Sequence, residues 1–405
     1  MPTLSESTYI FLLNYKHFDE KVKSKDKKMI FSLTFAKKNI TLQGLKQGEK
    51  KMDQIQFGII GCGRIARKHI PLLAEMPEAR IVAVCDPIEE RARAYATKYQ
   101  VPFYTDYRYM LEKEPSIQVV NILTPSGSHS SISIEVARMG KDIIVEKPMA
   151  LRLEDADQMI RTCDQNGVRL FVVKQNRYNL PIKKLRSAIE NDRFGKLVLG
   201  TVRVRWSRDQ AYYDMDKWRG TWAMDGGVLT NQASHHIDLL EWMMGNVESV
   251  VARTTTALLN IEVEDTGVAL LKFSNGALGV VEATVCARPN DLEGSISILG
   301  EKGTVEIAGF AVNQMRTWSF VDQTDEDNRV IEECNQYPQD VYGFGHYEYL
   351  KDVIYCIKNN KKALVDGLEG RKSLELINAI YESVETGNEV PLRFKPKKCK
   401  LGLNS

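Results

Sequence analysis

The spacing of hydrophobic residues changes abruptly near residue 54. Residues 1–51 mix aromatic, Lys-rich and polar stretches in which no helical or strand period is sustained. From Gln54 onward a short apolar run, Phe57 to Ile60, leads into a glycine-rich turn and then a helical pattern, which is how a βαβ domain normally opens. We therefore expect residues 1–51 to be an N-terminal extension that is either disordered or untranslated, with Met52 as the true start.

Short apolar runs then alternate with helical patterns as far as residue 175. Each run has the length of a buried strand, and the stretch from Glu90 to Tyr99 is typical of the helices between them. This alternation predicts an α/β fold with a doubly wound parallel sheet, a Rossmann domain over residues 52–175. The expected strands after the first are Ile81 to Cys85, Val119 to Leu123, Asp142 to Val145 and Leu170 to Val173.

Beyond about residue 180 the pattern shifts to longer runs in which apolar and polar residues alternate. Such alternation is typical of antiparallel strands with one buried face, and Arg203 and Arg205 would lie on the polar face. We therefore expect residues 176–393 to form an α+β domain with an open-faced, largely antiparallel sheet, followed by a tail over residues 394–405. The expected strands are Val198 to Trp206, Ser249 to Thr256, Thr266 to Phe273, Ala277 to Thr284 and Gly294 to Leu299.

The end of this second region returns to a helical pattern. The segment from Tyr347 to Ser383 predicts two helices with Gly367 and Gly370 between them. We expect both helices to pack back on the Rossmann domain. A chain of 405 residues is long enough for two or three domains of this kind.

Composition narrows the class of protein. The chain is 43% hydrophobic and 27% charged, and its formal charge of +2 gives no broad attraction for nucleic acid. Its seven cysteines are scattered, without the spacing of a zinc site or a disulfide scaffold, so we expect no structural metal and a reducing, cytoplasmic location. No apolar run is long enough to span a bilayer. We expect a soluble protein without nucleic-acid or membrane partners, whose ligand can still be an anionic small molecule.

The sequence Gly-Cys-Gly-Arg-Ile-Ala at residues 61–66 follows the first expected strand and opens a helix. It fits the G-x-G-x-x-G/A fingerprint in its required setting, where glycines allow a tight turn and the helix N-terminus stabilises a pyrophosphate. A purely structural turn, or a site for another nucleotide, is the alternative. The residues predicted to bind a dinucleotide here are Gly61, Cys62, Gly63, Arg64 and Ile65.

Asp86 ends the second expected strand, 23 residues after Gly63. A carboxylate at this point accepts hydrogen bonds from a ribose diol and repels the 2′-phosphate of NADP. Glu89 and Glu90 add negative charge to the same loop, whereas Arg91 brings a cation close to it. The cofactor expected from these residues is NAD.

Two further motifs, Thr124-Pro125 and Glu146-Lys147-Pro148, follow the next two expected strands. The carboxyl ends of parallel strands meet at one edge of the sheet, where doubly wound folds bind their ligands. A lysine between a strand end and a proline is held in an edge loop, although a surface cation is the alternative interpretation of Lys147. At this edge we expect further cofactor contacts from Thr124, Pro125, His129, Glu146 and Lys147.

The remaining catalytic candidates precede an apolar helix in the second region. Asn231 and His235 stand four residues apart and Asp238 three residues further on, so on one helix the three would share a face. Oxidation of an alcohol needs a proton acceptor beside the hydroxyl, and an unperturbed His pKa near 6.5 suits that role better than a Lys pKa near 10.4. We predict that His235 is the base, Lys147 polarises the hydroxyl and Asn231 positions the substrate. The alternative for His235 is a packed or helix-capping imidazole.

The chain resembles the glucose-fructose oxidoreductase, inositol dehydrogenase and rhizopine-catabolism (Gfo/Idh/MocA) family over roughly residues 53 to 393. The resemblance rests on four motifs in the family's order: the fingerprint, Thr124-Pro125, Glu146-Lys147-Pro148 and His235-x-x-Asp238. It implies a Rossmann domain with an open-faced sheet that forms homo-oligomers, dimers or tetramers. It also implies that Lys147 and His235 are the catalytic pair. One departure is that the family's usual Asp-x-Gly-x-His reads Asn231-x-Ala233-x-His235 here.

The stretch from Arg208 to Thr221, joined to residues 226–238, resembles a subgroup that oxidises the 3-hydroxyl of UDP-N-acetylglucosaminuronic acid (UDP-GlcNAcA) in bacterial surface-polysaccharide (O-antigen) synthesis. A uronate and a diphosphate are suitably recognised by guanidinium forks and aromatic faces. The expected substrate contacts are Gln175, Asn176, Arg177, Arg208, Tyr213, Arg219, Asn231 and His235.

Two other functions account for part of the sequence. A dehydrogenase of an unactivated sugar or inositol would explain everything except the segment from Arg208 to Thr221. A regulatory sensor could bind the dinucleotide without turnover, but it would not need both Lys147 and His235.

Overall fold

A computed structural model describes residues 54–335 and 344–392 of the chain. The expected N-terminal extension, the proposed start at Met52 and the expected tail over residues 394–405 lie outside these residues.

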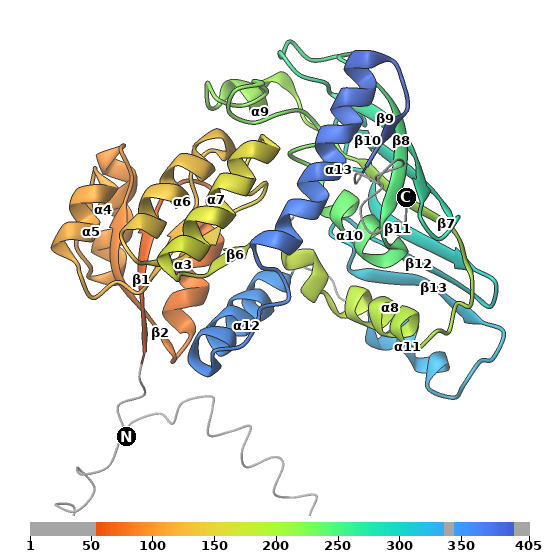
Figure 1. The fold of residues 1–405 in the computed structure, drawn as a ribbon, viewed down its shortest axis with the longest axis horizontal. Coiled ribbons are helices and arrows are strands. Elements are labelled where there is room, and N and C mark those ends of the chain that lie inside the picture. Colours follow the sequence, from red (N-terminus) through yellow and green to blue (C-terminus); the bar gives the residue numbers. More distant parts are fainter. Residues whose placement is uncertain (1–53, 336–343, 393–405) are drawn as a thin grey trace, which may run out of the picture. The chain divides into compact units, whose positions relative to one another are not determined.

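The first sheet consists of six parallel strands in the order β3-β2-β1-β4-β5-β6 (Figure 1). The strand order reverses between β1 and β4, and ligands of doubly wound folds bind beyond the carboxyl ends of the strands at such a point. This topology confirms the predicted Rossmann sheet. Its strands are β1 (Ile55–Ile60), β2 (Ala79–Cys85), β3 (Phe103–Tyr104), β4 (Val119–Ile122), β5 (Asp142–Val145) and β6 (Leu170–Val172).

Helices cover both faces of this sheet because its strands are apolar on both sides. One buried cluster joins the strands to α3 (Ala66–Glu75), α4 (Glu89–Tyr99) and α12 (Gly345–Asn359). A second cluster joins them to α5 (Tyr107–Lys113), α6 (His129–Arg138) and α7 (Leu153–Asn166). Helix α12 comes from the far end of the chain, so the core of the first domain contains residues about 300 positions apart in the sequence.

The second sheet has eight strands in the order β13-β12-β11-β7-β10-β9-β8-β14. Only β7 and β10 run parallel, and the remaining neighbours are antiparallel, which confirms the predicted, largely antiparallel sheet. The two-residue β14 and the hairpin of β12 and β13 were not predicted. The strands are β7 (Leu197–Arg205), β8 (Val247–Thr255), β9 (Thr266–Phe273), β10 (Leu278–Thr284), β11 (Glu293–Gly300), β12 (Gly303–Ala308), β13 (Gln314–Phe320) and β14 (Val390–Pro391).

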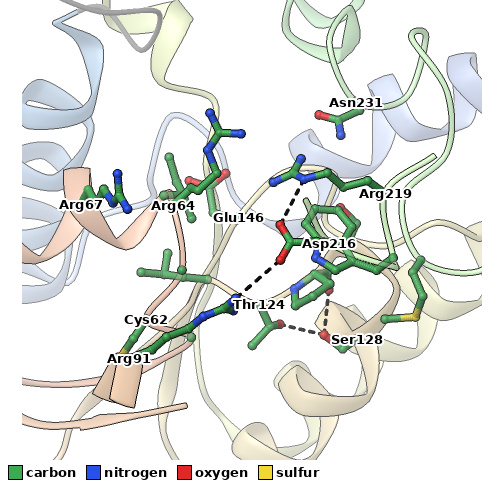
Figure 2. Close-up of a pocket in the computed structure, with 18 of the residues that line it drawn as sticks. Cys62, Arg64, Arg67, Arg91, Thr124, Ser128, Glu146, Asp216, Arg219 and Asn231 are labelled. Carbon is green, nitrogen blue, oxygen red and sulfur yellow. Dashed lines mark hydrogen bonds and ion pairs between the residues drawn. The ribbon is translucent and has the colours of Figure 1, made fainter. Parts of the chain in front are cut away.

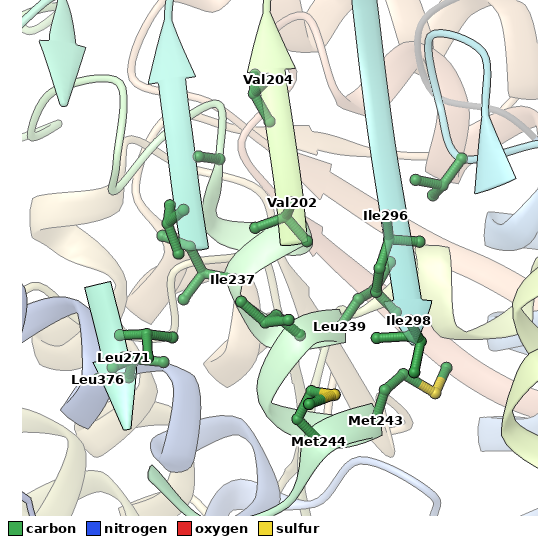
Figure 3. Close-up of a cluster of buried hydrophobic side chains, with 14 of the residues drawn as sticks. Val202, Val204, Ile237, Leu239, Met243, Met244, Leu271, Ile296, Ile298 and Leu376 are labelled. Carbon is green, nitrogen blue, oxygen red and sulfur yellow. The ribbon is translucent and has the colours of Figure 1, made fainter. Parts of the chain in front are cut away.

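One face of the second sheet is buried by α10 (Ser234–Met244) and α13 (Gly367–Thr386). Figure 3 shows side chains of α10, among them Ile237 and Met243, packed against strand residues such as Val202 and Ile298. The expectation that Gly367 and Gly370 separate two helices is wrong, because both glycines lie in the first turn of α13. A Cβ on Gly370 would lie 2.6 Å from the Val172 side chain, so this glycine allows α13 to approach β6.

The remaining helical segments are short. They are η1 (Ser126–Ser128), η2 (Gln175–Tyr178), α8 (Leu180–Glu190), α9 (Gln210–Asp214) and α11 (Asp327–Glu333). None of the helices in the described part of the chain combines the length and the apolar character needed to cross a membrane.

Candidate active site

A cavity of about 1700 Å³ lies at the carboxyl edge of the parallel sheet and extends to segments of the second domain. Every residue predicted to bind the cofactor lines this cavity. It is also lined by five of the residues predicted to contact substrate, namely Gln175, Arg208, Arg219, Asn231 and His235.

The turn of the fingerprint requires a glycine at its first position. Gly61 has a φ of +97°, and a Cβ on it would lie 2.7 Å from the backbone of Leu123. At Gly63 a Cβ would meet no atom within 4 Å, so the space beside this residue is open for a ligand. Burial and the charge of Asp86 raise the pKa of the Cys62 thiol to about 12, so Cys62 is a packing residue rather than a nucleophile.

Asp86 fixes the backbone of the fingerprint turn through hydrogen bonds. Its two carboxylate oxygens accept the backbone amides of Cys62, at 2.8 Å, and Ile88, at 2.9 Å. The side chain is fixed where a ribose diol would lie, at the end of β2. Arg91, the cation of the same loop, lies 3.5 Å from Asp216 of the second domain, as Figure 2 shows.

The loops that follow β4 and β5 are tied together by His129. Its ring nitrogens lie 2.8 Å from the carbonyl oxygen of Thr124 and 2.7 Å from that of Pro148. The Ser128 hydroxyl donates to Thr124, which closes the first loop (Figure 2). These contacts fix the backbone on both sides of the cofactor region and hold Lys147 at the cavity wall.

Lys147 meets Asn231 across the cavity. Its Nζ donates to the backbone oxygen of Asn231 at 2.7 Å and lies 3.4 Å from the side-chain oxygen of the same residue. Burial lowers the pKa of Lys147, with further lowering by Lys174 and Arg219, while the carboxylates of Glu146 and Asp225 raise it. A neutral lysine is therefore easier to form here than in water.

The expectation that Asn231, His235 and Asp238 share a helix face is wrong. Helix α10 begins only at Ser234, and Asn231 lies in the preceding turn, where its amide donates to the carbonyl of Gly227. Asp238 lies on the helix but pairs with Arg177 away from the cavity lining. Asn231 and His235 still meet at the cavity.

His235 is held by Gln175 from η2. The amide nitrogen of Gln175 lies 3.0 Å from Nε2 of His235, so Nε2 accepts and the proton of a neutral ring resides on Nδ1. Nδ1 has no hydrogen-bond partner among the described residues, and neither has the side-chain oxygen of Gln175. Burial and the neighbouring cations Lys147 and Lys174 lower the pKa of His235 well below 6.5, so the ring is neutral at neutral pH.

Glu146 is part of a buried cluster behind Lys147. Nε2 of His69 lies 2.9 Å from Oε1 of Glu146. One side-chain nitrogen or oxygen atom from each of His69, Glu146 and His346 lies within 4.8 Å of those of the other two. Burial raises the pKa of Glu146, but His69, His346 and Lys147 outweigh it and bring the value down to about 2. The spacing could hold a metal ion, yet the hydrogen bond between His69 and Glu146 already explains the arrangement as a polar network.

Three arginines gather around one phenol at the second-domain wall. Arg219 donates to the Tyr212 hydroxyl at 2.9 Å and to Asp216 at 3.2 Å, and Figure 2 shows the contact with Asp216. The guanidinium carbons that lie 4.7 to 5.5 Å from the centre of the Tyr212 ring belong to Arg64, Arg208 and Arg219. The cavity therefore offers positive charge and an aromatic face, which suits an anionic ligand.

Three residues predicted to contact substrate do not line the cavity: Asn176, Arg177 and Tyr213. Arg177 is 2% exposed and forms a bidentate pair with Asp238. The 3₁₀ turn η2 explains the difference, because successive side chains there diverge by a third of a turn and Gln175 takes the cavity side. Tyr213 is buried in the second-domain core, while its neighbour Tyr212 faces the cavity.

Several cavity residues were not predicted from the sequence. Tyr212, Asp216, Arg288 and His346 line the cavity, and Asp225 accepts a hydrogen bond from the cavity residue Asn231. Tyr212 and Asp216 lie in the stretch from Arg208 to Thr221 but were not singled out within it. Arg288 and His346 lie outside every motif, because their positions depend on a loop of the second domain and on α12. The motif pattern therefore finds the cofactor wall more completely than the opposite wall.

Family models match both domains. The model described as the NAD-binding Rossmann fold of an oxidoreductase family (GFO_IDH_MocA) matches residues 55–174. The model of the C-terminal alpha/beta domain of that family matches residues 186–392.

Individual relatives point to sugar chemistry. A myo-inositol 2-dehydrogenase from Thermotoga maritima is 30% identical, over 84% of this chain and 98% of its own. The WlbA dehydrogenase from Bordetella pertussis, solved in complex with NADH and UDP-GlcNAcA, is 44% identical with a TM-score of 0.81, over 84% of this chain and 99% of its own. The WlbA dehydrogenase from Chromobacterium violaceum, in complex with the same two molecules, is 41% identical with a TM-score of 0.80, over 85% of this chain and 97% of its own.

Proposed function

Because the chain belongs to the Gfo/Idh/MocA oxidoreductase family and is an NAD-dependent dehydrogenase of sugar-type substrates, we propose that it oxidises the 3-hydroxyl of UDP-GlcNAcA to a 3-keto sugar nucleotide. The observation that carries this proposal is the likeness to two WlbA dehydrogenases bound to that sugar nucleotide, at 41–44% identity over 84–85% of this chain and 97–99% of theirs. We assign the reaction to the synthesis of bacterial surface polysaccharide, in the cytoplasm.

The charges of the cavity support an anionic substrate. The side chains of Arg208 and Arg219 are 17% and 7% exposed, so a ligand anion would meet guanidinium groups that are largely removed from water. Tyr212 holds both of them on the cavity wall. Without a ligand these guanidinium groups pair with Asp291 and Asp216, and an uncharged inositol would add no opposite charge to them.

The residues present fit NAD. Gly61 allows the tight turn and Gly63 leaves space for a pyrophosphate. The Asp86 carboxylate lies where it would accept hydrogen bonds from a ribose diol, and Thr124 and Glu146 line the same cavity. When bound, NAD supplies the acceptor for the hydride that leaves the sugar carbon. The protein must supply the acceptor for the hydroxyl proton.

The pKa shifts of His235 and Lys147 exchange the roles in proton transfer that their unperturbed pKa values would give them. A pKa far below 6.5 makes His235 a poor final acceptor, whereas burial brings the pKa of Lys147 down toward a useful range. We therefore propose that neutral Lys147 takes the proton. His235 lines the same cavity and would hydrogen-bond the same oxygen, and Asn231 would hold the sugar beside Lys147.

Homo-oligomerisation is also proposed. Apolar side chains lie exposed on the second sheet at Val268, Leu270 and Leu278, between 48% and 63% exposed, opposite the face that α10 covers. A second copy of the chain would remove this surface from water. Sedimentation velocity should show a dimer or tetramer, and Leu270→Lys should dissociate it.

The test of the substrate is NADH formation with UDP-GlcNAcA, UDP-N-acetylglucosamine, UDP-glucuronate, glucose and myo-inositol, with a carbonyl trap present. UDP-GlcNAcA should exceed UDP-N-acetylglucosamine by tens-fold or more in kcat/KM, because a hydrogen bond between the uronate and a largely desolvated guanidinium contributes about 1.5 to 3 kcal/mol. Arg219→Lys should reduce that ratio, and Arg205→Lys, which pairs with Glu282 outside the cavity, should leave it unchanged. Efficient oxidation of myo-inositol without response to UDP-sugars would replace this function by the inositol dehydrogenase alternative, which the Thermotoga relative favours.

A further inference from the structure

Asp225 is a buried carboxylate next to the catalytic wall. It is 1% exposed and precedes Gly226, whose φ of +78° turns the chain back toward the cavity. One of its oxygens accepts the backbone amide of Gly220 at 2.9 Å, and the other accepts the side-chain amide of Asn231. A buried carboxylate is costly unless it has such partners, so its position is tightly specified.

The contact between Asp225 and Asn231 fixes which way the Asn231 amide points. A carboxylate can only accept hydrogen bonds, so the nitrogen of the amide must face Asp225. The oxygen of the amide is thereby turned to Lys147, whose Nζ lies 3.4 Å away. Asp225 therefore determines that the side chain of Asn231, like its backbone oxygen at 2.7 Å, presents a hydrogen-bond acceptor to Lys147.

We propose that Asp225 is a positioning residue for Lys147, which it serves both through the Asn231 amide and through its own negative charge. The inference rests on the proposed role of Lys147 as the proton acceptor. When the hydroxyl proton moves from the substrate oxygen to Nζ of Lys147, the new ammonium meets the oxygen of Asn231 and the field of Asp225. Asp225 thus supplies from the neighbouring turn a carboxylate that a residue at position 231 could have supplied directly.

The charges around Lys147 make this role specific. The groups that face it are the carboxylates of Glu146 and Asp225, the cations of Lys174 and Arg219, and the neutral ring of His235. Glu146 is bound to His69 and to the backbone amide of Lys147. Asp225 is the carboxylate whose bonded partner, Asn231, also contacts Nζ. Burial raises the pKa of Asp225, and the Gly220 amide, Arg219, Lys147 and Asn231 oppose that rise.

The pKa of Lys147 can be measured without any substrate. Protein labelled with [6-¹³C]lysine is saturated with NAD and titrated by NMR, with the Lys147 signal assigned by its loss in Lys147→Met. Asp225→Asn should lower the Lys147 pKa by on the order of one unit, because it removes a nearby opposite charge. Asp157→Asn removes a carboxylate that pairs with Arg371 outside the cavity, and should leave it unchanged.

An exchange of the two side chains separates positioning from a structural role. In Asp225→Asn, kcat/KM should fall roughly tenfold or more and its acid limb should move to lower pH. The double variant Asp225→Asn/Asn231→Asp places the carboxylate beside Nζ, and should restore the Lys147 pKa and much of the rate. An unchanged Lys147 pKa in Asp225→Asn, or a double variant no better than the single one, would overturn the proposal.

The role of Asp225 can still be tested if one variant does not fold or if the substrate differs. If Asp225→Asn does not fold, Asp225→Ser removes the same charge while its hydroxyl can still accept a hydrogen bond, and it should lower the Lys147 pKa in the same way; a constant pKa would count against the proposal. If UDP-GlcNAcA proves not to be the substrate, the NMR titration still decides the role of Asp225, because it uses only protein and NAD.

Discussion

The side-chain amide nitrogen of Gln175 lies 3.0 Å from Nε2 of His235. This contact and burial keep the imidazole neutral, so the wild-type kcat/KM should show no histidine titration between about pH 6 and 8. Gln175→Glu should raise the His235 pKa, because a carboxylate stabilises the imidazolium. Histidine NMR titration of the two proteins would measure the change, with Gln232→Glu as a neighbouring control. An unchanged His235 pKa would show that the residue at position 175 does not control the protonation of His235.

Lys147→Ala should retain the fold and the affinity for NAD but lose about 10² to 10⁴-fold in turnover, which is the usual contribution of general acid-base catalysis. His235→Ala should lose less, because we assign it a hydrogen bond rather than proton uptake. Steady-state kinetics and NADH fluorescence titration would measure the two effects separately. A larger loss in His235→Ala would restore His235 as the proton acceptor.

Asp86 should give NAD a large advantage over NADP, since like charges placed together cost several kcal/mol. Asp86→Ser combined with Pro87→Arg should relax this preference, and it should also lower the melting temperature because Asp86 accepts the amides of Cys62 and Ile88. The ratio of kcat/KM for the two cofactors measures the effect. Comparable efficiency of wild-type protein with both cofactors contradicts the assignment.

The pair of Arg177 and Asp238 should matter for stability rather than for substrate binding. Each side chain is 2% exposed, so Asp238→Ala leaves a buried guanidinium without its main partner, at a cost of about 3 to 5 kcal/mol. The free energy of unfolding in urea is the measurement. Glu248→Ala, which breaks an exposed pair with Lys272, should change it by less than about 1 kcal/mol. Similar losses in both variants would refute the distinction.

Glu264 should make stability depend on pH. It is 4% exposed, and burial raises its pKa to about 7, against the Leu229 amide and Tyr381. A carboxyl whose folded pKa is raised stabilises the protein fully below its unfolded pKa, near 4.5, and loses this contribution as pH rises through 7. The stability of wild type relative to Glu264→Gln should therefore fall by about 3 kcal/mol between pH 4.5 and 8. Urea unfolding of both proteins at several pH values would measure it; a constant difference would exclude the shift.

The sequence pattern predicted the strands well where burial is uniform. Asp142–Val145 and Thr266–Phe273 coincide with β5 and β9, because one is apolar on both faces and the other alternates cleanly. The hairpin of β12 and β13 carries weaker alternation, with a register shift after Glu306, and was missed. The fingerprint and Lys147 were found because strand, turn and helix follow one another directly in the sequence.

The second-domain wall was harder to predict because its contacts are not local. Asn231 was placed on the wrong element, since it ends a turn that begins at Gly227, before α10 starts at Ser234. Asp225 is connected to the site through its hydrogen bond with Asn231, and Asp216 through its contacts with Arg219 and with Arg91 of the other domain. Spacing along a helix cannot express either relationship.

The placement of α12 has a consequence for synthesis on the ribosome. Tyr349, Leu350 and Val353 complete the buried cluster on one face of the Rossmann sheet, although they are made long after β6 ends at Val172. Translation adds roughly 5 to 20 residues per second, so these side chains are synthesised about 10 to 40 s after the end of β6. During that interval the part of the sheet face that α12 covers is exposed to water, so we expect the nascent chain to recruit a chaperone and an isolated fragment ending near residue 175 to aggregate.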